Sequence, residues 1–139
     1  MAQLQKIMKR IHLIVGLLVI VAFVITGQFM LRDFPDKDVM SQELRVFMRS
    51  RHIYILFSAL IHLVLGVYLQ IRPQLWRRAL QYAGSAILVA CSVLLVKAFF
   101  SETYASQHAS AVSFSAVIGS LIGVGFHLIA GFGESQRGS

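Results

Sequence analysis

The chain is poor in charged residues and has one cysteine and no asparagine. Charged side chains make up 14% of its 139 residues, whereas a soluble domain carries about a quarter. The one cysteine, Cys91, excludes an intrachain disulfide and a redox centre built from paired cysteines. The absence of asparagine excludes ion or thiol sites that depend on this residue. What remains is strongly apolar, with a mean hydropathy of +0.72.

Long apolar runs fill most of the sequence. Runs of about twenty apolar residues are typical of membrane-spanning helices. Little sequence lies outside these runs, which excludes a separate soluble domain, and the short connections favour antiparallel packing of consecutive helices. The sequence therefore predicts an all-α fold, an integral membrane up-and-down four-helix bundle that forms a single membrane domain over residues 1–139. The predicted spans cover about 11–31, 52–71, 79–100 and 111–132.

The connection after the first span contains a helix-start signal. Asp38 or Ser41 is expected to cap a helix that runs through a polar extension, residues 41–51, into the second span. This connection carries both acidic residues and five basic ones, counted from Arg32 to Arg51.

Basic residues also indicate how the spans are oriented. The formal charge of +7 and the pI near 10.2 would suggest nucleic acid in a soluble protein. Here the basic residues cluster at span ends, where they meet lipid phosphates, so no nucleic-acid signal remains. The positive-inside rule predicts a multi-pass protein of the cell inner (cytoplasmic) membrane with both termini cytoplasmic. The residues that set this orientation are Lys6, Lys9, Arg10, Arg72, Arg77 and Arg78.

One pattern, His-Leu-x-x-Gly, occurs three times, each time inside an apolar run. A helical residue and the one four positions later share a face, so each copy places an imidazole one turn from a glycine. Imidazoles inside a membrane are costly and typically functional. A glycine leaves room for a flat group or for a neighbouring helix. The pairs are His12 with Gly16, His62 with Gly66, and His127 with Gly131.

Depth along the spans predicts which histidines act together. At about 1.5 Å per residue, His12 lies a few ångströms inside the first span and His127 about 7 Å from the inner end of the fourth. These two are the predicted axial ligands of a haem iron, because such ligands come from facing helices at similar depth. His62, about 15 Å deep, has no histidine at its own level and is left as a distal or alternative ligand.

Other residues complete this predicted cofactor site. His52 and His108, at the outer edge, form a candidate second ligand pair. Gly123 belongs to a row of small residues beside His127 that suits a flat macrocycle. Arg51 is placed to meet a haem propionate.

Each feature also has a structural explanation. Rows of small residues permit close helix–helix contact, and imidazoles hydrogen-bond between helices. For His62 and His127 the functional and structural interpretations are balanced. The structural one is favoured for histidines at the surface or in a connection, which are His12, His52 and His108.

Lys97 is the only formally charged side chain well within a predicted span. Snorkelling to the interface explains it at low cost, and binding of an anionic headgroup is the less favoured interpretation. No arrangement of nucleophile and base for hydrolysis is evident, so the sequence leaves open whether the protein is an enzyme.

The start of the first span resembles the first helix of several bacterial haem-handling membrane proteins, through His12, Gly16 and the later Thr26-Gly27. The overall plan is similar to compact four-helix di-haem cytochromes b, including the superoxide oxidase type. That resemblance implies histidines near both membrane faces that bind two haems and pass electrons between quinone and an outer partner. The chain departs from it in having no histidine in the predicted third span. Residues 51–54, Arg-His-Ile-Tyr, are also similar to a helix entrance in an uncharacterised bacterial membrane family, which implies no activity.

The leading hypothesis is a membrane b-type haem protein that carries single electrons, with one or two haem b groups and quinone as a candidate partner. The alternative is a non-catalytic accessory or assembly subunit of a membrane complex. A third hypothesis is a small transporter or channel that depends on His62. The expected partners are the lipid bilayer, quinone or another membrane subunit, with a homo-oligomer left open and no nucleic acid.

Overall fold

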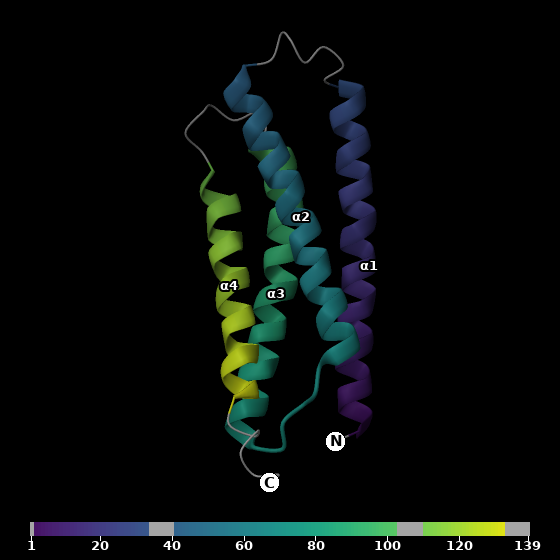
Figure 1. Ribbon diagram of the computed structural model, residues 1–139, viewed down its shortest axis with the longest axis vertical. Helices are drawn as coiled ribbons and strands as arrows, with labels where there is room; N and C mark the ends of the chain where they lie inside the picture. Colours follow the sequence, from purple (N-terminus) through teal and green to yellow (C-terminus); the bar gives the residue numbers. More distant parts are fainter. Residues whose placement is uncertain (1, 34–40, 103–109, 133–139) are drawn as a thin grey trace.

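The computed structural model describes residues 2–33, 41–102 and 110–132, and all regular structure in these ranges is helical. The all-α prediction is therefore confirmed for these ranges. Each of the four helices is also long and apolar enough to cross a membrane. Figure 1 shows the helices running alternately up and down, with the start of α1 and the end of α4 at the same end. The helices are α1 (Ala2–Asp33), α2 (Gln42–Tyr68), α3 (Leu75–Ser101) and α4 (Ala111–Gly131).

Three of the helices begin before the apolar run that predicted them. α2 starts at Gln42, ten residues before its run, because Ser41 caps it: the Ser41 hydroxyl accepts a hydrogen bond from the Leu44 backbone N–H at 3.3 Å. The predicted cap and polar extension are therefore confirmed. α1 starts at Ala2, nine residues before its run. Histidine depths counted from the apolar runs are consequently too shallow in α1.

The helices form two tight pairs. α1 packs along α2, and α3 packs along α4, while α2 and α3 join the pairs. Among the described residues, α1 and α4 do not pack directly against each other, and Figure 1 shows them at opposite edges of the bundle. The gaps between α1 and α3, and between α2 and α4, are therefore places where a groove can form.

Glycines allow the close approach within each pair. A Cβ atom on Gly16 would lie 2.9 Å from Leu63 Cδ2, and one on Gly66 would lie 2.6 Å from Leu13 Cγ. The contact is reciprocal. Leu63, which follows His62, packs on Gly16, and Leu13, which follows His12, packs on Gly66. In the second pair, a Cβ on Gly84 would lie 2.7 Å from the Gly123 carbonyl oxygen. These glycines therefore serve helix–helix packing.

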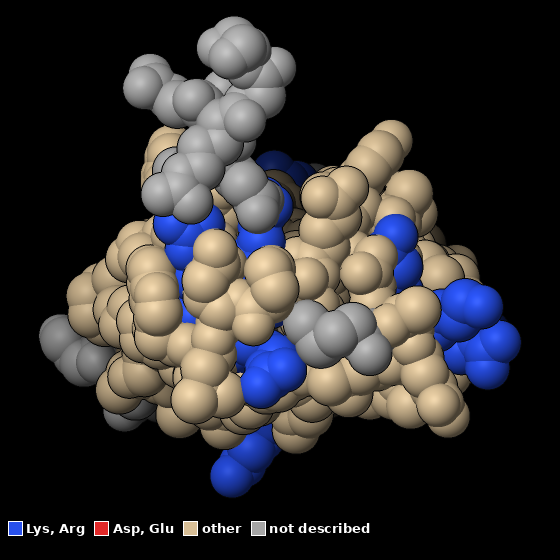
Figure 2. Space-filling model, turned by 90° about the horizontal axis from the view of Figure 1, so that it is seen from below, with Lys and Arg blue, Asp and Glu red and all other residues tan. Residues whose placement is uncertain are grey.

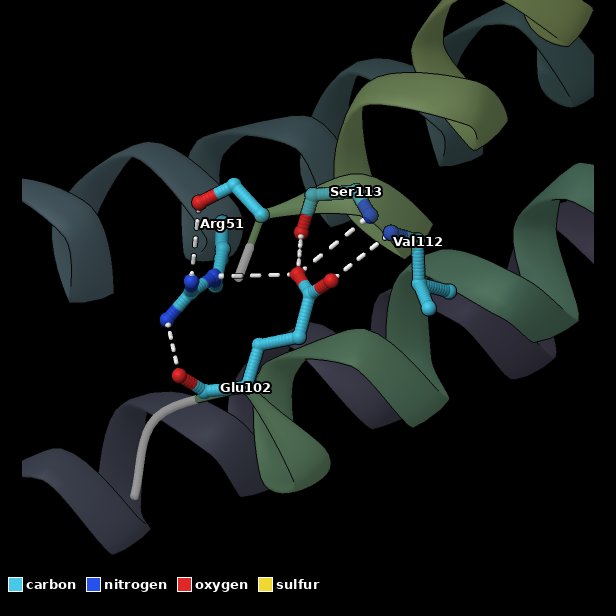
Figure 3. A network of polar contacts seen from close by, with 5 residues as sticks. Arg51, Glu102, Val112 and Ser113 are labelled. Carbon is cyan, nitrogen blue, oxygen red and sulfur yellow. Dashed lines mark hydrogen bonds and ion pairs between the residues drawn. The ribbon is translucent and has the colours of Figure 1, made fainter. Parts of the chain in front are cut away.

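A buried ion pair joins α2, α3 and α4 at the end of the bundle opposite the start of α1 (Figure 3). Arg51 Nε on α2 lies 3.5 Å from Glu102 Oε2 at the end of α3, and both side chains are 6% exposed. Arg51 also donates to the Glu102 backbone carbonyl at 2.9 Å and to the Ser110 hydroxyl at 3.2 Å. The Glu102 carboxylate accepts hydrogen bonds from the Val112 and Ser113 backbone N–H groups at 2.7 and 3.3 Å, so it caps α4. The Arg51 guanidinium is thus engaged in this network, and the prediction that it meets a haem propionate stays a prediction.

The two ends of the bundle differ in their described acidic residues, while basic residues occur at both ends. Figure 2 views the end that carries the start of α1 and the connection between α2 and α3, where lysines and arginines are spread over the surface. The acidic residues that the structure describes all lie at the other end, near the end of α1, the start of α2 and the end of α3: Asp33, Glu43 and Glu102.

Candidate functional site

Three of the predicted histidines meet in the interior, one from each of three helices. His12 Nδ1 on α1 lies 2.7 Å from His62 Nδ1 on α2. On its other side, His12 Nε2 lies 2.9 Å from the Ser85 hydroxyl on α3, and that hydroxyl lies 3.2 Å from His127 Nε2 on α4. His12 and His62 are fully buried. The structure thus brings together His12 and His127, the pair predicted from depth, with Ser85 between them.

The line of hydrogen bonds continues from His62. Its Nε2 atom lies 2.9 Å from the Ser92 hydroxyl, which in turn lies 2.6 Å from the Ser58 hydroxyl. The Ser92 hydroxyl also has a carbonyl acceptor, Leu88 O, at 2.9 Å. We call the six connected side chains the histidine–serine chain: His127, Ser85, His12, His62, Ser92 and Ser58.

The histidine–serine chain has two self-consistent hydrogen-bond directions when its imidazoles are neutral, since each neutral ring donates from one nitrogen and accepts at the other. If Ser92 donates to Leu88 O, His62 Nε2 donates to Ser92, and His12 Nδ1 donates to His62 Nδ1. The Ser85 hydroxyl then donates to His12 Nε2 and accepts from His127 Nε2, so His127 Nδ1 carries no hydrogen and can only accept. If Ser92 instead donates to His62, its bond to Leu88 O is lost, the bonds from His62 to His127 reverse, and His127 Nδ1 carries a hydrogen. The free Nδ1 atom of His127 is therefore an acceptor in one direction and a donor in the other.

His127 Nδ1 has no partner. It is buried and makes no hydrogen bond in the structure, although buried polar atoms are nearly always paired. A Cβ placed on Gly84 of α3 would lie 3.0 Å from His127 Cδ2, so that edge of the ring faces α3. Nδ1 is on the opposite edge of the ring, away from α3.

An apolar groove lies between α2 and α4 beside this ring. Its volume is about 390 Å³, and His127 is the only polar residue that lines it. The other lining residues are Phe57, Leu60, Ile61, Val64, Leu65, Val124 and Leu128. The groove can accept an apolar molecule. His127 lines it through ring carbon atoms, because its Nδ1 atom is covered as the helices are packed.

The prediction that His62 has no histidine at its own level is wrong. His12 lies ten residues after the start of α1, and His62 lies six residues before the end of α2 at Tyr68. At about 1.5 Å per residue these positions are about 15 Å from the start of α1 and about 9 Å from the end of α2. The two side chains meet because α1 extends beyond its apolar run.

His52, toward the end of the bundle opposite the start of α1, lies apart from the histidine–serine chain. His52 Nδ1 lies 2.9 Å from the Thr26 hydroxyl, which donates to the Phe23 carbonyl. Its ring stacks on Phe23 with centroids 4.0 Å apart and an interplanar angle of 17°. His108 lies outside the described residues, so the predicted pairing of His52 with His108 stays a prediction.

The geometry does not fit a haem between the helices as they are packed. The His12 and His127 rings lie edge to face, with centroids 6.2 Å apart and an interplanar angle of 74°, and their Nε2 atoms share the Ser85 hydroxyl. The spaces beside Gly16 and Gly66 are filled by leucines, and Gly123 lies against α3 backbone. Gly131 alone of the predicted glycines has open space around it. In the described ranges no three His, Cys, Asp or Glu side chains are placed to hold a metal ion.

The hydroxyl members of the chain were not found from the sequence. Ser85 and Ser92 are seven residues apart, about two helical turns, and Ser58 precedes His62 by four residues. That spacing places each serine on the same face as its partner, but serine is common in helix–helix contacts, so the spacing alone has little specificity.

Comparison of the chain with protein-family models, with curated proteins and with solved structures finds no match. The resemblance to di-haem cytochromes b therefore stays a prediction.

Proposed function

We propose that the protein spans the cell inner membrane four times, with both termini cytoplasmic, and binds a quinone or quinol of the lipid phase at His127. The observation that carries this proposal is the buried, unpartnered His127 Nδ1 at the end of the histidine–serine chain, beside an apolar groove. The proposed function is to hold the ligand and exchange a proton with one of its oxygen atoms.

The charge distribution supports the membrane orientation. The end seen in Figure 2 carries basic side chains and no described acidic residue, whereas the opposite end carries both basic and acidic residues. Cytoplasmic connections carry an excess of lysine and arginine. The histidine–serine chain would then lie in the cytoplasmic half of the bilayer.

The chemistry of the groove selects the class of ligand. Apolar walls favour a molecule that partitions into lipid, and a single imidazole nitrogen can engage one hydroxyl or one carbonyl. Because the histidine–serine chain has two hydrogen-bond directions, Nδ1 can accept from a quinol hydroxyl or donate to a quinone carbonyl once a shift of the His127 ring uncovers this atom to the groove. A quinone and its quinol are the lipid-soluble pair that offers both groups at one position.

The transporter hypothesis has less support. The histidine–serine chain extends over seven residues of α3, from Ser85 to Ser92. This length is about 10 Å, whereas the hydrocarbon layer of a membrane is about 30 Å thick. Toward the outer side follows a buried apolar cluster that includes Val19, Ile55 and Leu95. Beyond that, His52 is ten residues, about 15 Å, from His62 along α2. Within the part of the chain that the structure describes, no line of polar groups joins the two levels.

Binding can be measured with decylubiquinone, which quenches tryptophan fluorescence, and the single tryptophan, Trp76, is near the start of α3. We expect saturable quenching by the full chain in detergent. His127→Leu should weaken binding about tenfold, the effect of losing one well-placed hydrogen bond. Val64→Phe, which fills the groove, should abolish saturation.

Two variants serve as controls. Val93→Phe makes the same change at an exposed position outside this groove, and His52→Leu removes the outer imidazole; both should bind as the unchanged chain does. Equal binding by the unchanged chain and His127→Leu would overturn the proposal.

A further inference from the structure

We infer that a second groove, between α1 and α3, binds an anionic phospholipid of the outer leaflet, with Lys97 facing the phosphate and one acyl chain in the groove. This inference is independent of the quinone proposal, because it uses different helices and a different polar group.

The groove has the shape and the lining that an acyl chain requires. Its volume is about 450 Å³. It follows α3 from Val89 to Phe100, eleven residues or about 16 Å. Its walls on the α1 side are aliphatic, and its wall on the α3 side includes Val93, which is 65% exposed. Transfer of an acyl chain from lipid into the groove gives no hydrophobic gain, so the apolar walls alone do not select a ligand.

Lys97 supplies the selectivity. It lines the groove and lies four residues before the end of α3 at Ser101, about 6 Å below the outer helix end. Its ammonium group is therefore within reach of the headgroup level, as expected for a snorkelling lysine. Ser92, the only other polar lining residue, is engaged in the histidine–serine chain. The groove thus presents one positive charge at its outer end above apolar walls.

This arrangement is complementary to an amphiphile with a negative headgroup and an apolar tail. A zwitterionic phospholipid offers the same tail but no net charge. One basic residue near an anionic membrane surface favours an anionic lipid by about 1 kcal/mol, or about fivefold in affinity.

The test is native mass spectrometry of the full chain in detergent with equal amounts of phosphatidylglycerol and phosphatidylcholine that carry the same acyl chains. The unchanged chain should retain phosphatidylglycerol about fivefold more than phosphatidylcholine. Lys97→Gln, which keeps the side-chain length, should remove this preference. Val93→Phe, which fills the groove, should lower retention of both lipids.

Arg49→Gln is the matched control, because Arg49 is an exposed cation on α2 toward the outer end of the bundle and does not line the groove. It should leave the preference unchanged. Equal retention of both lipids by the unchanged chain would overturn the inference. So would a preference that survives Lys97→Gln, or one that Arg49→Gln removes equally. A Val93→Phe variant that stays helical and retains both lipids as the unchanged protein does would show that the lipid does not lie in this groove. That result would also overturn the inference.

Discussion

His12 and His62 meet through their Nδ1 atoms, 2.7 Å apart, although fifty positions separate them in the sequence. At that distance one nitrogen carries a hydrogen and the other accepts it, so the two rings hold opposite tautomers. The leucines next to them, Leu13 and Leu63, fill the glycine gaps of the facing helix. The repeated His-Leu-x-x-Gly pattern therefore forms a reciprocal lock between α1 and α2.

The first prediction concerns the energetic coupling of this pair. We expect a double-mutant cycle with His12→Ala and His62→Ala to give a coupling free energy of about 0.6–1.7 kcal/mol, as for hydrogen bonds between membrane helices. The measurement is unfolding of the purified protein in mixed micelles by a denaturing detergent. If the two free-energy changes add within about 0.3 kcal/mol, the direct bond is contradicted.

The second prediction separates packing glycines from open ones. Gly66→Ala should destabilise the protein by about 1–3 kcal/mol, because a Cβ there would lie 2.6 Å from Leu13 Cγ and 3.0 Å from the Leu13 backbone nitrogen. Gly131→Ala is the control, since a Cβ there meets nothing within 4 Å. The same unfolding measurement checks both. A stable Gly66→Ala variant would show that the two helices do not approach as closely as described.

The third prediction concerns the outer ion pair. Glu102→Gln should cost about 3–5 kcal/mol, because it leaves the buried Arg51 charge without its partner. Glu43→Gln is the control: Glu43 is exposed at the start of α2, where a single charge contributes little. We expect a lower unfolding midpoint for Glu102→Gln only. Equal midpoints for the two variants would mean that Arg51 and Glu102 do not form a buried pair in solution.

The fourth prediction tests the haem hypothesis. Since leucines and helix backbone occupy the glycine gaps, we expect the purified protein to lack a Soret band, before and after addition of dithionite. Supplementing the growth medium with a haem precursor controls for limited haem supply. A Soret band that His127→Ala removes would show that the helices separate to admit the cofactor.

The fold was largely predictable because hydropathy reports spans directly. Four apolar runs gave four helices, and the cap at Ser41 was readable from its side-chain chemistry. Depth along a span was less predictable, because α1 continues through polar residues that hydropathy does not count. Because α1 starts nine residues before its apolar run, His12 lies deeper in the bundle than predicted and contacts His62. The sequence had predicted no histidine partner for His62.

The site was predictable in its imidazoles and not in its connections. Histidines are rare inside spans, so His12, His62 and His127 were evident. The residues that hydrogen-bond to the histidines and to Arg51 were not evident from the sequence. Ser85 gives no signal that distinguishes it from a packing serine, and Glu102 becomes buried only because α2 and α4 close over it. Arg51 was assigned to an outside ligand because its partner is 51 positions away.

The most direct test of the proposed ligand site is the ¹⁵N spectrum of the protein with labelled histidine rings, recorded during titration with decylubiquinol. Assignments come from single histidine-to-glutamine variants. We predict that the His127 Nδ1 resonance moves from the position of an unbonded nitrogen to that of a hydrogen-bonded one as ligand is added, while the His52 resonances stay fixed. A His127 Nδ1 resonance that does not change at saturating ligand would contradict the site.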